Sequence, residues 1–298
     1  MNLFHSKNAI GFEAIMIRLV HAFSAVTALG FLCACASSFA GPQFTTAPSI
    51  TPNPNVRAPL VALLDFRAPE TARTIVSLND GNRQWEIEFD GAPQDEPFPI
   101  IGMRAGRRLE MQLTVYDVDD NASVWDGDLF FDAPPLPIDR YSMPEFDVRV
   151  ADQDRMEPGI TVLSVRRALN IRPQDRSPAQ QAFVESYGLL LALDSEGEVV
   201  WFHQSDDRIA GIDRLSNGNL LYHMASFTAV EMDWLGNLVR SWTPENKPEG
   251  IPRYEDSIPI KGIQTLHHQP HEVGEGNFLS FSANWRVIEN WYLSLIHI

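Results

Sequence analysis

The chain contains an internal repeat, and a repeat restricts the architectures that a sequence can adopt. Residues 193–201 (LDSEGEVVW) recur as residues 232–240 (MDWLGNLVR), and residues 215–221 (LSNGNLL) recur as residues 273–279 (VGEGNFL). Each motif places a glycine turn between runs of strand-forming residues, as a β-hairpin requires. The repeat therefore predicts units of short antiparallel strands, of the kind that form propeller blades.

The repeat also shows which residues the fold itself does not require. Counting back eight positions from the glycine of the second motif (218 to 210, and 276 to 268) gives Ala210 in the first copy and His268 in the second. The unit is built once without histidine, so its fold does not require histidine there. His268 belongs to residues 264–286, which hold three of the eight histidines together with Arg286. We take this segment as the candidate site.

Short apolar runs separated by turn residues predict strands along most of the chain. In the N-terminal half the runs have the spacing of a β-sandwich: 60–66, 74–78, 84–89, 99–103 and 109–116. Farther on, four runs predict a single four-stranded unit, with a second unit starting near Val230: 189–193, 199–203, 209–215 and 220–224. We predict an all-β chain with an N-terminal β-sandwich followed by an incomplete β-propeller of about two blades.

Composition shifts suggest the domain limits. We expect an export signal (1–40), a linker (41–58), the β-sandwich domain (59–170), the partial propeller (181–292) and a non-native tail (293–298). The linker is proposed because it is rich in Pro, Thr and Asn. The tail is proposed because its residues fit codons of a sequencing adapter, CTG TCT CTT ATA CAC ATC. A long insertion at 244–263 is a candidate substrate lid.

The amino terminus predicts export. Met16-Ile17-Arg18 precedes an apolar run at 19–34, and Ser38-Phe39-Ala40 offers the small residues of a cleavage site. Alternatively Cys35 is the lipid-bearing residue of a lipobox, which would tether the protein to a membrane by its lipid. We therefore expect a periplasmic or outer-membrane-anchored protein. The apolar run is too short to favour a permanent span.

The charge excludes one class of partner. The chain has 39 acidic against 23 basic residues and a net charge of -16. No basic face for nucleic acid is visible, so we expect no nucleic-acid partner. A site for an anion must then be a local exception, built from residues such as Arg286 and the histidines.

At this point the chain resembles the bacterial arylsulfate sulfotransferase family, exported enzymes with a small β-sandwich ahead of a six-bladed propeller. The resemblance rests on residues 193–201 and 215–221, and above all on Leu266-His267-His268 leading to Gly276-Asn277. Family members usually show His-His-Asp before a Leu-Pro-Asn-Gly-Asn turn. Here Gln269 replaces the aspartate, and residues 273–275 replace Leu-Pro-Asn.

The resemblance implies transfer of a sulfuryl group from a phenolic sulfate to another phenol, with no nucleotide or other cofactor. In the family the nucleophile is a transiently sulfated histidine on a later blade. The sequence stops before such a blade, so we expect the 298-residue chain to be inactive alone. The donor, the acceptor and the choice between monomer and homodimer stay open.

The predicted roles follow from side-chain chemistry. Arg286 offers a charged planar fork to sulfo oxygens, and His268 can donate to them or handle the phenol proton. His267 is expected to orient or pack, on the opposite side of an extended strand from His268. Trp285, next to Arg286, and His223, at a strand end, are candidate substrate contacts.

Two other functions compete with sulfuryl transfer, namely metal binding and a non-catalytic role. His267, His268 and His271 could bind zinc, but alternation along a strand would scatter them, and we expect no metal. The main alternative to an enzyme is a non-catalytic exported propeller that serves as a binding or assembly platform. Gln269 favours that alternative because it weakens the family match at the site.

Overall fold

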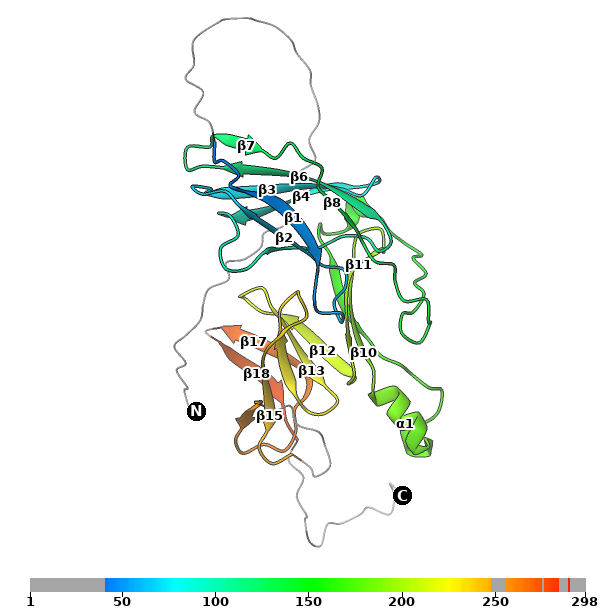
Figure 1. The fold of residues 1–298 in the computed structure, drawn as a ribbon. Helices are drawn as coiled ribbons and strands as arrows, with labels where there is room; N and C mark the ends of the chain where they lie inside the picture. Colours follow the sequence, from blue (N-terminus) through cyan, green and yellow to red (C-terminus); the bar gives the residue numbers. More distant parts are fainter. Residues whose placement is uncertain (1–40, 248–255, 275, 284–288, 290–298) are drawn as a thin grey trace, which may run out of the picture.

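The computed structural model describes residues 41–247, 256–274, 276–283 and 289 (Figure 1). Apart from one α-helix and two short 3-10 turns, the regular structure within these ranges is β, which confirms the all-β class. None of the helices in the described ranges is long and apolar enough to cross a membrane. The predicted export signal with Cys35, the tail at 293–298, Trp285 and Arg286 lie outside the described residues.

The N-terminal part contains two sheets that share a core, as the alternating runs predicted. One sheet has the order β1-β2-β5, with β1 (Thr46–Pro52), β2 (Ala62–Arg67) and β5 (Phe98–Ile100). The other has the order β4-β3-β6-β7, and β8 also pairs with β6: β3 (Arg73–Asn79), β4 (Gln84–Asp90), β6 (Arg108–Tyr116), β7 (Ala122–Val124) and β8 (Phe130–Asp132). Buried and exposed positions alternate along β6, so Leu109 and Leu113 face the core.

The prediction of a linker at 41–58 is wrong. β1 lies within this range and pairs antiparallel with β2. Its proline-rich composition suits a tether, but β1 is an edge strand, and edge strands tolerate proline because one side has no partner to bond. Beyond β1, the side-chain Nδ2 of Asn53 donates to the carbonyls of Ala58 and Leu235, at 2.9 Å each, so this segment also joins distant parts of the chain.

Between the sheets of the two halves the chain is largely irregular. It contains a 3-10 turn η1 (Gln153–Arg155), strand β9 (Thr161–Val165), a second turn η2 (Pro173–Asp175) and helix α1 (Pro178–Glu185). The helix was not predicted, although its start carries a clear signal. Ser177 accepts from the backbone nitrogen of Gln180, and the Gln180 side chain accepts from the backbone nitrogen of Ser177, which makes a capping box ahead of Pro178.

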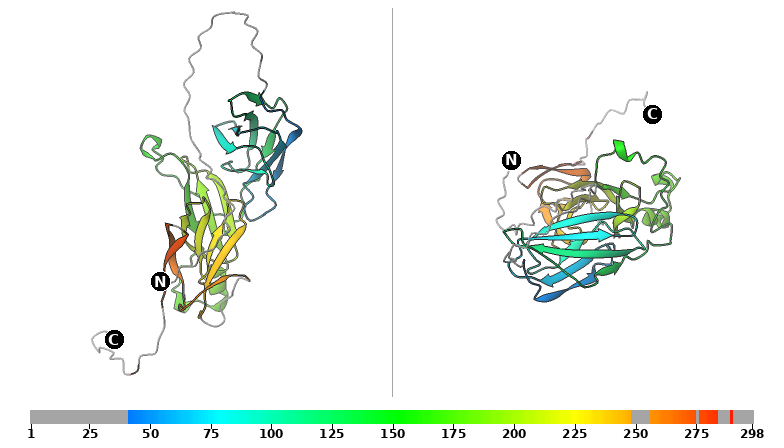
Figure 2. Two further views of the ribbon diagram at one scale, coloured as in Figure 1. Left: turned by 90° about the vertical axis from the view of Figure 1, so that its left-hand side faces the viewer. Right: turned by 90° about the horizontal axis from the view of Figure 1, so that it is seen from above.

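Strand β10 (Gly188–Leu193) connects the two halves of the molecule. It pairs with β9 on one side and β11 (Val199–Ser205) on the other. Because successive side chains point to opposite faces, Leu189 and Leu191 join the core of the N-terminal sheets, whereas Leu190 and Ala192 join a second core. The apolar run of β10 is thus buried on both faces, and the predicted boundary near residues 170–181 does not separate two cores. The ribbon shows the N-terminal sheets at one end of the molecule and the C-terminal sheet at the other (Figures 1 and 2).

The C-terminal part contains a five-stranded sheet and a hairpin. The sheet has the order β12-β13-β14-β15-β16, with β12 (Ile209–Arg214), β13 (Leu220–Met224), β14 (Ala229–Met232), β15 (Leu238–Pro244) and β16 (Ile258–Ile260). The hairpin consists of β17 (His267–Gly274) and β18 (Asn277–Phe281). Its first strand lies against β12 and β13 (Figure 1).

The grouping of strands differs from the predicted four-stranded unit at 189–224. Its strands are all present, but β10 and β11 belong to one sheet while β12 and β13 belong to the next, with β14 and β15. A sequence repeat shows which hairpins are equivalent. It does not show at which strand the repeated structural unit begins. The hydrophobic pattern therefore could not decide the grouping.

The described part of the insertion lies away from β12. β16 pairs parallel with β15 at the opposite edge of the sheet. The backbone nitrogen of Glu245 donates to the carbonyl of Ile260 at 2.9 Å, which closes this segment onto the same edge. The rest of the predicted lid, residues 248–255, is outside the described residues.

The repeated turns have the same backbone geometry. Gly197 and Gly236 have φ values of 82° and 81°, and each backbone nitrogen donates to the carbonyl of the aspartate three residues earlier, Asp194 or Asp233. A positive φ is unfavourable for residues with a Cβ, so both copies use glycine. The equivalence inferred from the sequence is therefore confirmed at the level of the turn.

Candidate functional site

An open pocket of about 340 Å³ lies where β9, β12 and β17 approach one another. Its lining residues are Ser164, Arg166, Ile209, Ala210, Gly211, His268 and Gln269. Gly211 is required by the closeness of the strands, because a Cβ there would lie 2.5 Å from the Cα of Gln269. The lining contains cationic and neutral polar groups but no carboxylate.

The two positions matched by the repeat meet at this pocket. Ala210 lies on β12 and His268 on β17, and both line the cavity. Alanine at position 210 has no polar group, so the repeated fold does not need one there. The imidazole at position 268 is therefore not required by the fold.

His268 has an unusual backbone conformation. Its φ is 65°, a region that residues other than glycine seldom adopt. The pairing of β17 with β18 is irregular between His267 and His271, where the bend occurs. Such conformations carry a cost of about 1–3 kcal/mol and concentrate at functional sites. The strained residue is also the one that the sequence singled out.

The bend brings His267 and His268 together, which corrects the prediction that they point to opposite sides. Their Nδ1 atoms are 2.6 Å apart and their ring centroids 4.8 Å apart. The prediction assumed an extended strand, and the positive φ of His268 breaks that alternation. Since one nitrogen must donate and the other accept, the pair shares one proton along this contact.

Phe281 completes the surroundings of the pair, and sequence reasoning did not identify it. Its ring lies 6.1 Å from that of His267 at 12°, and 5.8 Å from that of His268 at 68°. It is 67% exposed. Phe281 is opposite His267 in the hairpin, but the register shifts twice along β17, so counting outward from the turn at Gly276 would not have placed it there.

His223, a predicted substrate contact, lies behind the site. It is buried, and its Nε2 donates to the carbonyl of Leu266 at 2.6 Å. Burial lowers the pKa of His223, which the bond to Leu266 only partly opposes, so the ring is held neutral. Its role here is to support the chain that leads into His267.

His271 joins β17 to β12 and is not among the residues that line the pocket. Its Nδ1 lies 2.7 Å from Oδ2 of Asp213 on β12. The next residue, Glu272, accepts from the backbone nitrogen and hydroxyl of Ser216, at 2.6 and 3.1 Å. These bonds fix the position of the strand that carries His268.

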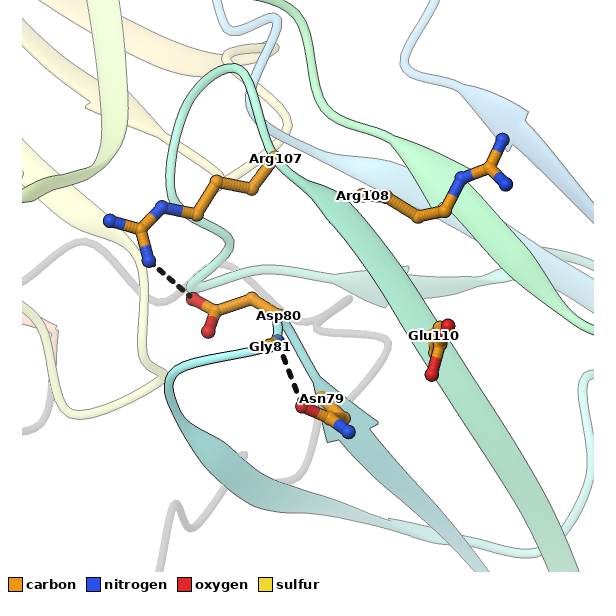
Figure 3. A pocket seen from close by; sticks show the side chains of 6 residues that line it. All are labelled: Asn79, Asp80, Gly81, Arg107, Arg108 and Glu110. Atoms are coloured by element: carbon orange, nitrogen blue, oxygen red, sulfur yellow. Dashed lines mark hydrogen bonds and ion pairs between the residues drawn. The ribbon is translucent and has the colours of Figure 1, made fainter.

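A second pocket, of about 330 Å³, lies at the turn between β3 and β4 and has a structural explanation (Figure 3). Oδ2 of Asp80 is 3.9 Å from Nη1 of Arg107, while its Oδ1 accepts from the backbone nitrogens of Asn82 and Arg83. Arg108 instead forms a bidentate pair with Asp132. Both arginines that line this pocket therefore have a carboxylate partner.

Within the described ranges, no three His, Cys, Asp or Glu side chains gather as a metal site would. Arg286 and Trp285, the other predicted members of the site, lie outside those ranges. No protein-family model and no curated protein matches the chain.

Proposed function

We propose that this protein is an exported aryl sulfotransferase, which moves a sulfuryl group from a phenolic sulfate ester to a phenol without a nucleotide. One observation carries the proposal: His268, which has a positive φ and contacts His267, lines a pocket whose lining has no carboxylate, in a chain of net charge -16. A pocket without carboxylates in an otherwise acidic protein suits an anionic ligand.

The proposed chemistry is balanced by a single exchange. The bond between sulfur and the donor's phenolic oxygen breaks, a sulfur–oxygen bond forms to the acceptor, and the acceptor's proton ends on the released phenol. Negative charge on the sulfo oxygens needs fixed donors aimed at them. No histidine of this chain is assigned as a nucleophile.

The contact between the two histidines determines which nitrogen of His268 can donate to a sulfo group. When His267 Nδ1 donates to His268 Nδ1, the proton of a neutral His268 must be on Nε2. Among the described residues Nε2 of His268 has no hydrogen-bond partner, so it is available to a ligand. His267 would then act as the orienting residue, and Phe281 would offer its exposed ring to the aryl group.

The architecture suggests where such a site would sit. We interpret β9, β12 and β17 as inner strands of successive propeller blades, following a β-sandwich formed by the N-terminal sheets. Repeated turns, short antiparallel strands and the adjacency of β9, β12 and β17 support this interpretation. Ligand sites between repeated units are a common use of such folds.

Binding of 4-nitrophenyl sulfate to the purified chain, followed by calorimetry, tests the proposal. His268→Gln should weaken binding by about tenfold, because it removes an imidazole that hydrogen-bonds an anion. Arg149→Gln is the control: Arg149 is exposed and pairs with Asp147, away from β17, so its replacement should leave binding unchanged.

Two results would contradict the proposal. One is native affinity in His268→Gln. The other is failure of the native chain to bind the ester, which would favour the alternative of a non-catalytic platform.

A further inference from the structure

We infer that Arg166 and Ser164 bind the sulfo group of a sulfate monoester in the pocket beside His268. This inference rests on the proposed function, and it assigns the anion-binding groups that the described residues contribute. Nothing in the sequence pattern distinguished Arg166 from the other arginines.

The position of Arg166 is the first observation. It follows the last residue of β9 and lines the same pocket as His268 on β17. Ser164, two residues earlier, also lines the pocket, as expected for side chains on one face of a strand. The donors therefore come from two different strands and converge on one cavity.

The availability of Arg166 is the second observation. Within the described residues its guanidinium has no ion pair or hydrogen-bond partner. The adjacent Arg167 is engaged: it lies over the rings of Tyr187 and Phe183, at 4.2 and 4.6 Å, and its Nε donates to the carbonyl of Tyr141. Two successive arginines thus have different roles, one in packing and one facing open space.

The charge of the pocket is the third observation. Around the other pocket Arg107 faces Asp80, so positive charge is balanced locally. Around Arg166 the lining offers no carboxylate. A guanidinium fork can bond two oxygens of a sulfo group, a serine hydroxyl can donate to the third, and His268 can approach the bridging oxygen.

The size of the cavity agrees with this ligand class. A volume of about 340 Å³ admits a sulfo group and one aromatic ring. The pocket is also open, so an aryl group can extend out of it toward solvent. A sulfate monoester of a phenol is therefore of a size that this pocket can accept.

The test uses calorimetric titration of 4-nitrophenyl sulfate, inorganic sulfate and uncharged 4-nitrophenol into the chain. Arg166→Gln should raise the Kd of both sulfo ligands about tenfold and leave 4-nitrophenol unchanged. Arg166→Lys should recover part of the affinity, because an ammonium keeps the charge without the fork. Arg149→Gln is the control: Arg149 is exposed and pairs with Asp147, and its loss should not change binding.

The outcomes separate the two proposals. Native sulfate affinity in Arg166→Gln, with weakened binding in His268→Gln, overturns the role of Arg166 and leaves the proposed function intact. Weakened binding in Arg166→Gln with native affinity in His268→Gln supports the anion site and overturns the sulfotransferase assignment. Equal losses of affinity in Arg166→Gln and Arg149→Gln would also overturn the role of Arg166, because they would show that the net charge of the protein, and not a specific contact, determines binding.

Discussion

Nε of Arg104 donates to Oδ2 of Asp194 at 2.7 Å, and both side chains are almost completely buried, at 3% and 5% exposure. Arg104 follows β5 in the N-terminal sheets, whereas Asp194 begins the turn between β10 and β11. Nη2 of Arg104 also donates to Glu196, and Nη1 of Arg83 reaches Asp194 at 3.4 Å. Ion pairs from the N-terminal part therefore hold the first repeated turn in place.

Arg104→Met should destabilise the chain by about 3–5 kcal/mol, because it leaves the carboxylate of Asp194 buried without its main partner. Urea unfolding followed by circular dichroism would measure the loss. Arg108→Met is the matched control, since Arg108 also pairs with an aspartate, Asp132, but at an exposed position. Its stability should stay close to that of the native chain. Equal losses in the two variants would show that burial of the pair contributes nothing.

His203 should make stability depend on pH. Burial, with a smaller contribution from nearby Arg57, lowers the pKa of His203 to about 4. An unfolded histidine has a pKa of about 6.5, so between these values the unfolded state binds a proton that the folded state does not. Stability is therefore highest above pH 6.5 and falls by about 3 kcal/mol as the pH drops toward 4.

His203→Phe removes the titrating group while keeping a planar ring near Trp201. Urea unfolding at several pH values between 7.5 and 4 should show a shallower decline for this variant than for the native chain. The carboxylates titrate in both proteins, so the difference between the two curves isolates His203. Parallel curves would contradict a lowered pKa at this position.

Glu231 should give a second pH dependence, at lower pH. Burial raises the pKa of Glu231, but hydrogen bonds from Arg240, Asn219 and Asn217 outweigh it, so the pKa lies below its usual range. A carboxylate with a lowered pKa stabilises the fold above its unfolded pKa, and this contribution is lost as the pH falls through the folded value.

Glu231→Gln should therefore lower stability at pH 7 by about 1–3 kcal/mol and flatten its acid dependence, because a neutral amide accepts less strongly from Arg240. Differential scanning calorimetry at pH 7 and pH 3 checks both effects. Glu86→Gln serves as the control, since Glu86 accepts from Ser77 at an exposed position. An unchanged difference between the two pH values in Glu231→Gln would refute this assignment.

The sequence predicted local structure well because local structure depends on local patterns. Short apolar runs located β2 to β6 and β10 to β13, and the repeated glycines located the turns at Gly197 and Gly236. The partition of β10 to β13 between two sheets depends on contacts far apart in the chain, which a pattern of period two does not encode. The edge strand β1 was missed because its proline content resembles that of a linker.

The candidate site was predictable only in part, for the same reason. The repeat isolated His268, because a matched copy shows what the scaffold needs. The positive φ of His268 and its contact with His267 occur where the pairing of β17 with β18 is irregular, and no local rule anticipated that irregularity. Arg166 belongs to no motif, and only the adjacency of β9, β12 and β17 places it at the pocket.

Gly211→Ala should disrupt the pocket through the backbone. The new Cβ would meet the Cα of Gln269 at 2.5 Å, and backbone cannot move aside as a flexible side chain can. β17 must then shift away from β12, which displaces His268 from Arg166. We expect a stability loss of about 1–3 kcal/mol from overpacking and a loss of 4-nitrophenyl sulfate binding.

Gly81→Ala is the control for adding a methyl group to a glycine. Gly81 has a φ of 86°, and its Cβ would meet nothing within 4 Å, so the change costs only local backbone strain of about 1–2 kcal/mol. Both variants should thus lose some stability, but only Gly211→Ala should lose affinity for the ester. Calorimetric titration alongside urea unfolding separates the two effects. Native affinity in Gly211→Ala would mean that the close approach of β12 and β17 does not shape the site.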